Sequence, residues 1–323
     1  MLSFPKITVA ICSRNRPREL EECLASLQPI RSKAHEIIVV DNGSDGDATK
    51  KVAEKYKTVY IHEPTIGLST ARNSAIRSAS GEIIAFIDDD CQVDPGWLDA
   101  IARAFGDRRI GAVTGKAISG DQSNWVQRQF NSFARGFCAA ESVEMTPEKV
   151  GNIYIKAVLG VGANMAFRRE LLVALKGFST FFQDCSDDDY LQCRVIRAGY
   201  HVRYAPDSIV FQKHRTGMLS TLHRLFEYGV GDTRLLWYFS AQDQSFKKFL
   251  YNFIWTLVHS ELRTLFQSII HFRGWHVLFS LASIAGYLSG LLLPWGWSAH
   301  LCGKFPDRPD LTGPNSREEI PES

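Results

Sequence analysis

The stretch IIAFIDDD, residues 83–90, decides the fold. Five apolar residues run directly into three aspartates, which is the pattern of a buried strand that ends at a polar edge. Apolar runs of the same kind occupy residues 7–11, 36–40 and 59–61, and helical patterns lie between them at residues 19–27, 50–56 and 69–80. Strands that alternate with helices predict an α/β fold with a Rossmann-like, mostly parallel sheet flanked by helices.

Three of these predicted strands end in polar clusters. The clusters are residues 13–16, 41–44 and 88–90. In open α/β sheets, ligands bind outside the carboxyl ends of the strands. The sequence therefore predicts a functional site where these three clusters meet.

The aspartate triplet itself indicates a divalent cation. Strand side chains alternate between faces, so Asp88 and Asp90 are expected to point together and Asp89 away from them. Two carboxylates that repel each other are best explained by a shared cation, and Mg²⁺ or Mn²⁺ prefers such oxygen ligands. The alternative is a solvated acidic turn.

Composition and charge exclude several classes of protein. The chain has 323 residues, of which 45% are hydrophobic and 22% are charged, so it is globular rather than disordered. A net charge of +2 gives no reason to expect a nucleic-acid partner. Seven scattered cysteines without C-x-x-C spacing argue against a disulfide framework or a zinc site, and favour a reducing compartment. No signal-peptide pattern occurs at the first residues, so the protein is expected to start in the cytosol.

Four segments together resemble glycosyltransferase family 2. They are VAICSRNR at residues 9–16, IVVDNGS at 38–44, GLSTARNS at 67–74 and IAFIDDD at 84–90. Their order and spacing match the family over roughly the first hundred residues. The resemblance implies an inverting enzyme of the GT-A fold that uses a nucleotide-sugar donor and a divalent metal.

The resemblance also implies roles for individual residues. It implies that Asp41 reads the imide of the nucleobase and that Arg72 helps to hold the nucleotide. It assigns Asp88 to the ribose and Asp90, with Asp88, to the metal that bridges the diphosphate. The remaining nucleotide-sugar contacts are Ser13, Arg14 and Asp89, and Arg14 stands where the family commonly has an aromatic residue. The alternatives are turn capping for Asp41 and a surface ion pair for Arg72.

The general base is expected in the second half of the chain. The segment DDDYLQCR at residues 187–194, followed by AGY at 198–200, resembles the family's E-D-x-D…R…A-G-Y segment. Alignment on Arg194 and Gly199 places Asp188 at the base position, and a shift of one residue makes Asp187 the base. The alternative is a helix N-terminus that carries favourable negative charge.

Two further segments resemble parts of the family's site. His214 follows the apolar run at residues 209–211, where a histidine completes the metal site in many relatives, although a surface histidine is an equal alternative. The segment GVGAN at residues 160–164 resembles one that lies near the acceptor and the donor sugar. Its glycines permit a close backbone approach, and the simpler reading is a bulged strand.

The C-terminal part of the chain has the pattern of membrane-associated helices. Residues 246–272 carry a long amphipathic stripe, and residues 275–297 contain no formally charged side chain. Ala282, Gly286 and Gly290 form a ridge of small residues suited to close helix packing. The predicted organisation is a catalytic domain over residues 1–240, a helical region over 241–303 and a flexible tail over 304–323. The alternative is that both stretches are buried helices that cover the sheet.

These observations predict an inverting glycosyltransferase that transfers a sugar to a hydroxyl of a glycan or a lipid-linked acceptor. UDP- or dTDP-sugar is favoured because a carboxylate pairs with a uracil or thymine imide, and GDP-sugar is the second choice. The expected location is the cytoplasmic face of a membrane, such as the bacterial inner membrane. The alternative function is a catalytically degenerate protein of the same fold that acts as a membrane-associated scaffold. An oxidoreductase is disfavoured because no G-x-G-x-x-G follows the first strand.

Overall fold

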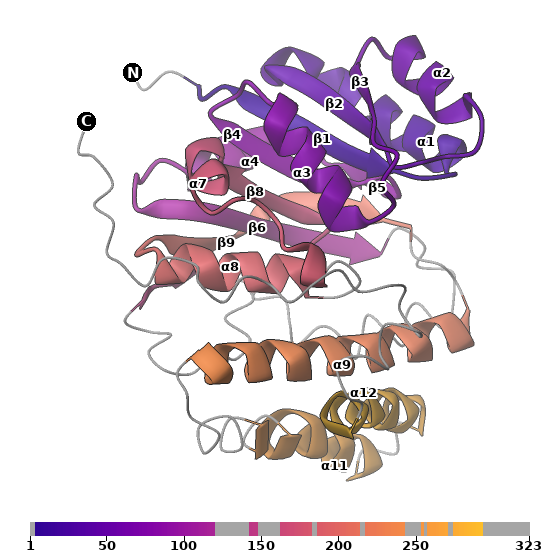
Figure 1. Cartoon of the computed structure of the whole chain (residues 1–323), viewed down its shortest axis with the longest axis vertical. Helices are drawn as coiled ribbons and strands as arrows, with labels where there is room; N and C mark the ends of the chain where they lie inside the picture. Colours follow the sequence, from indigo (N-terminus) through magenta and orange to yellow (C-terminus); the bar gives the residue numbers. More distant parts are fainter. Residues whose placement is uncertain are drawn as a thin grey trace.

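The computed structural model describes residues 4–119, 142–147, 162–182, 186–213, 217–242, 253–254, 257–270 and 274–292. These residues form a sheet with helices on both faces, and C-terminal helices pack below it in the view of Figure 1. Several predicted features lie outside the described residues: His214, Gly160, residues 246–252 and 293–297, and the tail over residues 304–323.

Nine strands of the described residues form one sheet (Figure 1). The order across the sheet is β3–β2–β1–β4–β8–β6–β9–β5, and β7 pairs with β9. In chain order the strands are β1 (Ile7–Ser13), β2 (Glu36–Asp41), β3 (Val59–His62), β4 (Ile83–Asp88), β5 (Cys91–Val93), β6 (Ile110–Ser119), β7 (Val143–Met145), β8 (Asn164–Arg168) and β9 (His201–Gln212).

The sheet is mixed rather than mostly parallel. Strands β1 to β4 pair in parallel, as the sequence predicts, and β6 pairs in parallel with β9. However, β8 runs antiparallel to both β4 and β6, and β5 and β7 run antiparallel to β9. The prediction of a mostly parallel sheet is therefore wrong for the second half. The alternation of strands with helices that requires parallel pairing stops after β4, and β8 enters between β4 and β6 from the opposite direction.

Successive strand residues point into two separate cores on the two faces of the sheet. In β1, Val9 and Ile11 face one core, and Ala10 between them faces the other. The helices of the first core are α1 (Pro17–Leu27), α2 (Ala48–Lys55) and α4 (Trp97–Ala104). The helices of the second core are α3 (Leu68–Ser78), α7 (Arg169–Ala174) and α8 (Asp187–Arg197). The 3₁₀ helices η1 (Gln28–Lys33) and η3 (Thr180–Phe182) complete this part.

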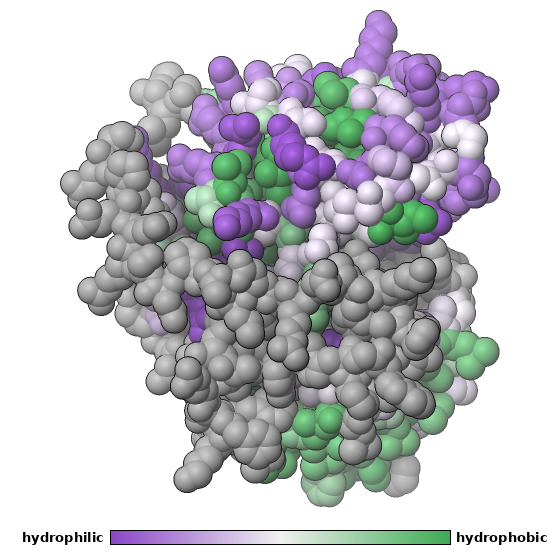
Figure 2. All heavy atoms as spheres, in the orientation of Figure 1, coloured by the Kyte–Doolittle hydropathy of each residue, from purple (hydrophilic) through white to green (hydrophobic). Residues whose placement is uncertain are grey.

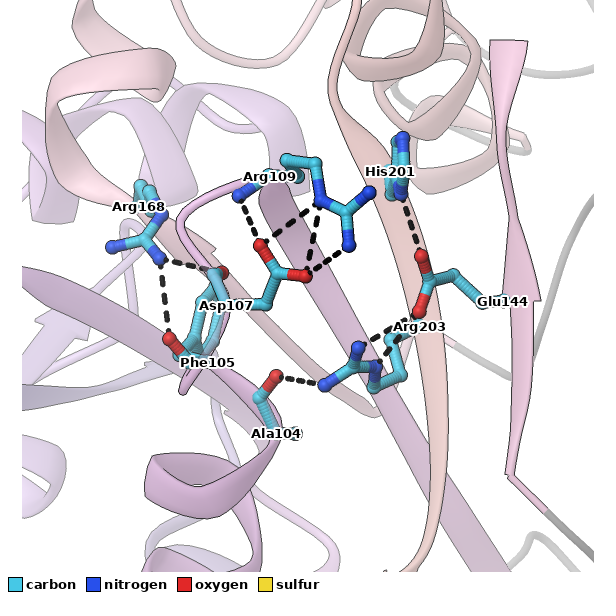
Figure 3. A network of polar contacts seen from close by, with 8 residues as sticks. All are labelled: Ala104, Phe105, Asp107, Arg109, Glu144, Arg168, His201 and Arg203. Atoms are coloured by element: carbon cyan, nitrogen blue, oxygen red, sulfur yellow. Dashed lines mark hydrogen bonds and ion pairs between the residues drawn. The ribbon is translucent and has the colours of Figure 1, made fainter. Parts of the chain in front are cut away.

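A polar network fixes the edge of the sheet where β6 and β9 begin (Figure 3). Glu144 of β7 accepts hydrogen bonds from Arg203 at 2.8 Å and contacts Nδ1 of His201 at 2.6 Å. Arg203 also donates to the carbonyl of Ala104 at 2.8 Å, and Arg168 donates to the carbonyl of Phe105 at 3.2 Å. These bonds join four elements at the edge opposite the carboxyl ends of the parallel strands.

A long helix that the sequence reading missed connects the sheet to the C-terminal helices. Helix α9 (Met218–Gln242) contains Gly229 and Gly231 in its interior, and glycine has low helix propensity, so the pattern did not predict it. Leu235 of α9 packs against Tyr190 and Cys193 of α8. On its other side α9 packs against α12 (Gly274–Leu292). Figure 1 shows α9 between α8 and the last helices.

The predicted ridge of small residues lies in the contact between α9 and α12. A Cβ on Gly286 would lie 2.0 Å from the backbone oxygen of Phe226, and one on Gly290 would lie 2.8 Å from Cβ of Thr233. This confirms that the glycines of the ridge permit close packing. The alternative that this stretch covers the sheet is not what is seen, because α12 packs on α9.

The preceding stripe is present in part as a π-helix, η4 (Leu257–Leu262), and α11 (Arg263–Ile270). Phe253 is buried against Tyr287 of α12, whereas Phe266 and Ile269 expose 64% and 53% of their surface. Among the helices in the described part of the chain, none is both long and apolar enough to cross a bilayer.

Candidate active site

The ends of three strands meet at one edge of the sheet. Ser13 at the end of β1 pairs with Asp41 at the end of β2. Cys12 of β1 pairs with Asp88 at the end of β4. The predicted convergence of the three polar clusters is therefore confirmed.

Arg72 joins this edge to the second half of the chain. It lies on α3 and exposes only 4% of its side chain. Its Nη1 atom lies 2.8 Å from Oδ2 of Asp187, and its Nη2 atom lies 3.6 Å from Oδ1 of Asp88. Ser69 of the same helix donates to Asp187 at 3.0 Å. Burial alone would lower the pKa of Arg72, but Asp187 and Asp88 outweigh it and raise that pKa. The alternative of a surface ion pair is therefore wrong, because the pair is buried.

Asp188 has different surroundings from its neighbour Asp187. Both lie in the first turn of α8, so the predicted negative charge at a helix N-terminus is confirmed. Asp187 is buried in the ion pair with Arg72, whereas Asp188 is only partly buried. A Cβ on Gly162 would lie 2.7 Å from Oδ2 of Asp188, so the backbone approaches this carboxyl group closely. Burial first, and then the charge of Asp187, raises the pKa of Asp188 to about 6.

The acidic triplet does not alternate as a strand would. Strand β4 ends at Asp88, and residues 89–90 lie in a turn. Asp89 accepts hydrogen bonds from Ser13 Oγ at 2.8 Å and from Arg16 Nη1 at 2.5 Å. Arg16 also reaches Oδ2 of Asp90 at 3.4 Å. The expectation that Asp89 points away from Asp90 is therefore wrong, since both carboxylates contact one guanidinium group.

The residues at this edge are chemically suited to a divalent cation. Burial raises the pKa of Asp88, and the charges of Asp90 and Asp187 raise it further while Arg72 opposes them. Asp88 ends β4 and Asp90 lies two residues later in the following turn, so both carboxylates belong to this edge of the sheet. Within the described ranges, no three His, Cys, Asp or Glu side chains are grouped to hold a metal. Mg²⁺ commonly uses one or two carboxylates together with substrate phosphates, so this donor set fits it or Mn²⁺.

The strand that leads to His214 ends beside Asp90. The backbone N–H of Lys213 donates to the carbonyl of Asp90 at 2.9 Å, and Gln212 donates to the Asp90 carboxylate at 3.2 Å. His214 follows Lys213 and lies outside the described residues. The contacts of these neighbours bring the end of β9 to the acidic triplet.

Asp41 is held in place by two hydrogen bonds. Its Oδ1 atom accepts from the backbone N–H of Ser44 at 3.0 Å, which confirms the alternative of turn capping. Its Oδ2 atom accepts from the Tyr60 hydroxyl at 2.9 Å. Burial and this bond raise the pKa of Tyr60 to about 12. Asp41 exposes only 1% of its surface, and each of its carboxylate oxygens has a hydrogen-bond partner within the protein.

The loops after β1 and β2 are tied together beside Asp41. Asn15 donates to Oδ2 of Asp45 at 2.9 Å, and the backbone N–H of Asp45 donates back to Asn15 at 2.7 Å. Arg14 precedes Asn15 and is exposed. The two loops therefore form one unit at the edge of the sheet.

Two residues of this site were missed by the sequence reading. Arg16 lies in the quoted segment VAICSRNR and holds both Asp89 and Asp90. Ser69 lies in GLSTARNS and supports Asp187. Position inside a matched segment was the available signal, but the partners lie more than 70 residues away in the chain and only the fold brings them together.

The chain is similar in sequence to known glycosyltransferases. The chain is 26% identical over 216 residues to glycosyltransferase AglE of Haloferax volcanii, covering 64% of this chain and 66% of that protein. It is 24% identical over 232 residues to the O-antigen chain rhamnosyltransferase WbaN of Salmonella anatum, covering 70% of this chain and 72% of that protein.

Solved structures show the same fold. A mannosyltransferase, PcManGT of Pyrobaculum calidifontis, superposes with a TM-score of 0.57 at 19% identity, covering 90% of this chain and 88% of that chain. The architecture is accordingly a GT-A-like, mixed and curled sheet flanked by helices. The family model described as glycosyl transferase family 2 matches residues 8–175, just over half of the chain. The chain therefore belongs to glycosyl transferase family 2 and is a glycosyltransferase.

Proposed function

We propose that this enzyme transfers a sugar, with inversion, from a nucleoside diphosphate to a hydroxyl group of a glycan or a lipid-linked acceptor. The observation that carries the proposal is the contrast between Asp187 and Asp188 at the same edge as Asp88. Asp187 is occupied by Arg72 and Ser69, and Asp188 beside it has a pKa raised to about 6. A general base works best when its pKa lies near the operating pH. Asp188 is therefore the proposed base, and Asp187 is a positioning residue.

The proposed step is a single displacement at C1 of the sugar. The acceptor oxygen forms a bond to C1 from the side opposite the diphosphate, and the bond between C1 and the diphosphate oxygen breaks. Asp188 takes the proton of the acceptor hydroxyl, and the electron pair leaves with the nucleoside diphosphate. Arg72, held between Asp187 and Asp88, adds fixed positive charge beside the site of transfer.

The donor side of the site rests on the acidic triplet. Asp90 and Asp88, with His214, are the proposed ligands of Mg²⁺ or Mn²⁺. When bound there, the cation neutralises charge on the leaving diphosphate. Solved relatives of the same fold contain such groups: PcManGT holds GDP-Man and Mn²⁺, and a glucosyl-3-phosphoglycerate synthase of Mycobacterium tuberculosis, with a TM-score of 0.50, holds UDP and Mn²⁺.

The rest of the nucleotide is assigned to the neighbouring strand ends. Asp41, lined by Ser13 and Arg14, is proposed to pair with the imide of uracil or thymine, and Asp88 and Asp89 to contact the ribose side. This favours a UDP- or dTDP-sugar. The support is the register that places Ser13 beside Asp41 and Cys12 beside Asp88.

A thermal-shift panel tests this donor assignment. UDP, dTDP, GDP and ADP are compared with and without Mn²⁺, because a ligand that binds only the folded state raises the melting temperature. We expect UDP or dTDP with Mn²⁺ to give the largest increase, and Asp90→Asn to remove the Mn²⁺ dependence. Equal stabilisation by adenine and uracil nucleotides would contradict the base assignment.

The C-terminal helices suggest where the acceptor lies. Hydrophobic side chains gather over these helices at the lower end of the molecule in Figure 2. The exposed residues there include Ile254, Val258, Leu262, Phe266, Ile269, Ile270, Trp275, Leu278, Leu281, Leu288 and Leu291. A contiguous apolar surface of this kind marks an interaction site. We assign it to a lipid surface at the cytoplasmic face of a membrane, where a cytosolic nucleotide sugar and a lipid-linked acceptor meet.

A further inference from the structure

Arg16 occupies a particular position in the acidic triplet. It follows β1 and directly precedes α1, and its side chain is 26% exposed. Its Nη1 atom lies 2.5 Å from Oδ1 of Asp89, and its Nη2 atom lies 3.4 Å from Oδ2 of Asp90. One guanidinium group therefore bridges two successive carboxylates that are themselves largely buried.

The two contacts differ in strength. Asp89 is fixed by Ser13 as well as by Arg16, at 2.8 Å and 2.5 Å, so this end of the bridge is the anchor. The contact with Asp90 is almost 1 Å longer than the contact with Asp89, and it engages only Oδ2. The Oδ1 atom of Asp90 is turned toward Gln212, 3.2 Å away. The Arg16–Asp90 contact is therefore the part of the bridge that is most easily replaced.

Two arginines contact different aspartates of the acidic triplet. Arg72 faces Asp88, and Arg16 faces Asp89 and Asp90. A divalent cation held by Asp90 would compete with Arg16 for that carboxylate, while Arg16 would keep its contact with Asp89 and so its positive charge nearby. Like charges a few ångströms apart in a partly buried site repel strongly.

We propose that Arg16 is a built-in counter-cation that competes with the divalent metal for Asp90 and so sets the metal affinity of the site. The proposal rests on the metal role proposed above for Asp90. Arg16 stays anchored to Asp89 while Asp90 exchanges the guanidinium for the metal. Its role is positional, because it acts on the metal site through the carboxylates.

The test is Mn²⁺ binding in the absence of nucleotide, followed by the electron paramagnetic resonance signal of free Mn²⁺. In Arg16→Gln the competing charge is gone, so we expect the dissociation constant for Mn²⁺ to fall by about tenfold or more. The increase in melting temperature caused by Mn²⁺ should also be larger in this variant than in the wild type. Arg16→Lys keeps the positive charge although it loses the two-nitrogen bridge, so its dissociation constant for Mn²⁺ should lie closer to that of the wild type than that of Arg16→Gln does.

Arg18→Gln is the matched control. Arg18 lies two residues away on α1, is 89% exposed and pairs only with Glu22 in the described contacts, at 3.5 Å. Its substitution should leave Mn²⁺ binding unchanged. Suppose that Arg16→Gln binds Mn²⁺ as weakly as the wild type or more weakly, and that binding still depends on Asp90. That result would overturn the counter-cation role of Arg16 and leave the metal assignment of Asp90 in place. Mn²⁺ binding that survives unchanged in Asp90→Asn would instead overturn the metal assignment on which the proposal rests.

Discussion

At the residue scale, adjacent side chains of one helical turn have different chemistry because their neighbours differ. Asp187 accepts hydrogen bonds from Arg72 and Ser69, so its carboxylate connects α8 to α3. Asp188 lies against the backbone of Gly162 with a raised pKa. The sequence could not separate these two aspartates, since a shift of one residue exchanges them in the motif. The partners that separate them come from segments about 25 and 115 residues away.

The pKa of Asp188 predicts the acid side of the pH–rate profile. A general base must be ionised, so kcat/KM should fall about tenfold per pH unit below a pH of about 6. The ordinary pKa of this carboxyl is 3.8, so the folded chain binds the extra proton between about pH 4 and pH 6. The contribution of Asp188 to the free energy of unfolding therefore decreases as pH rises through that window.

Two measurements check this prediction. A kcat/KM that stays constant from pH 7 to pH 5 would contradict the assignment. In thermal unfolding, Asp188→Asn should melt at a higher temperature than the wild type above pH 6, and the difference should shrink toward pH 4. Asp107→Asn, on the far edge of the sheet, should show the opposite sign because its pKa is lowered to about 2 by Arg109.

At the element scale, the sequence pattern predicted those strands and helices that are determined by residues close together in the chain. Strands β1 to β4 and the polar clusters at their ends follow from short apolar runs, and their parallel register follows from the helices between them. Helix α9 and the antiparallel direction of strand β8 were not predictable in this way. Gly229 lowers helix propensity in isolation, and its close approach to the backbone of α12 explains why a glycine stands there.

The contact between α9 and α12 gives a matched pair of variants. A Cβ on Gly286 would lie 2.0 Å from the backbone oxygen of Phe226, whereas one on Gly274, in the same helix, meets no described atom within 4 Å. We expect Gly286→Ala to lower the free energy of unfolding by about 1–3 kcal/mol because the helices must separate. Gly274→Ala should leave it unchanged or slightly higher. Equal melting temperatures for the two variants would show that the close approach does not matter.

At the scale of the whole molecule, α9 joins the catalytic part to an apolar surface. Leu235 on one side packs on α8, and Gly229 on the other packs on α12. The amphipathic pattern predicted helices in this region but not which residues would remain exposed. That depends on α9, which covers Tyr287 and Phe253 and leaves Phe266 exposed.

Vesicle binding tests the proposed lipid surface. The full chain should sediment with vesicles of phosphatidylcholine and phosphatidylglycerol. The double variant Phe266→Ser with Ile269→Ser should bind them at least about tenfold more weakly, because two large apolar side chains no longer enter the lipid. Val173→Ser is the control, since Val173 is 55% exposed on α7 in the catalytic part. Equal binding by the double variant and the control would refute the assignment.

The most direct test of the central claim separates binding from turnover in Asp188→Asn. Nucleoside diphosphate release is measured with Mn²⁺ and whichever UDP-, dTDP- or GDP-sugar turns over fastest, and nucleotide binding is measured by calorimetry. We predict that Asp188→Asn binds the nucleotide within a few-fold of the wild type and turns over about 10²–10⁴-fold more slowly. Asp187→Asn, which leaves the buried Arg72 without its nearest partner, should lose stability and binding together. Full turnover by Asp188→Asn, with Asp187→Asn losing turnover but not binding, would contradict the account.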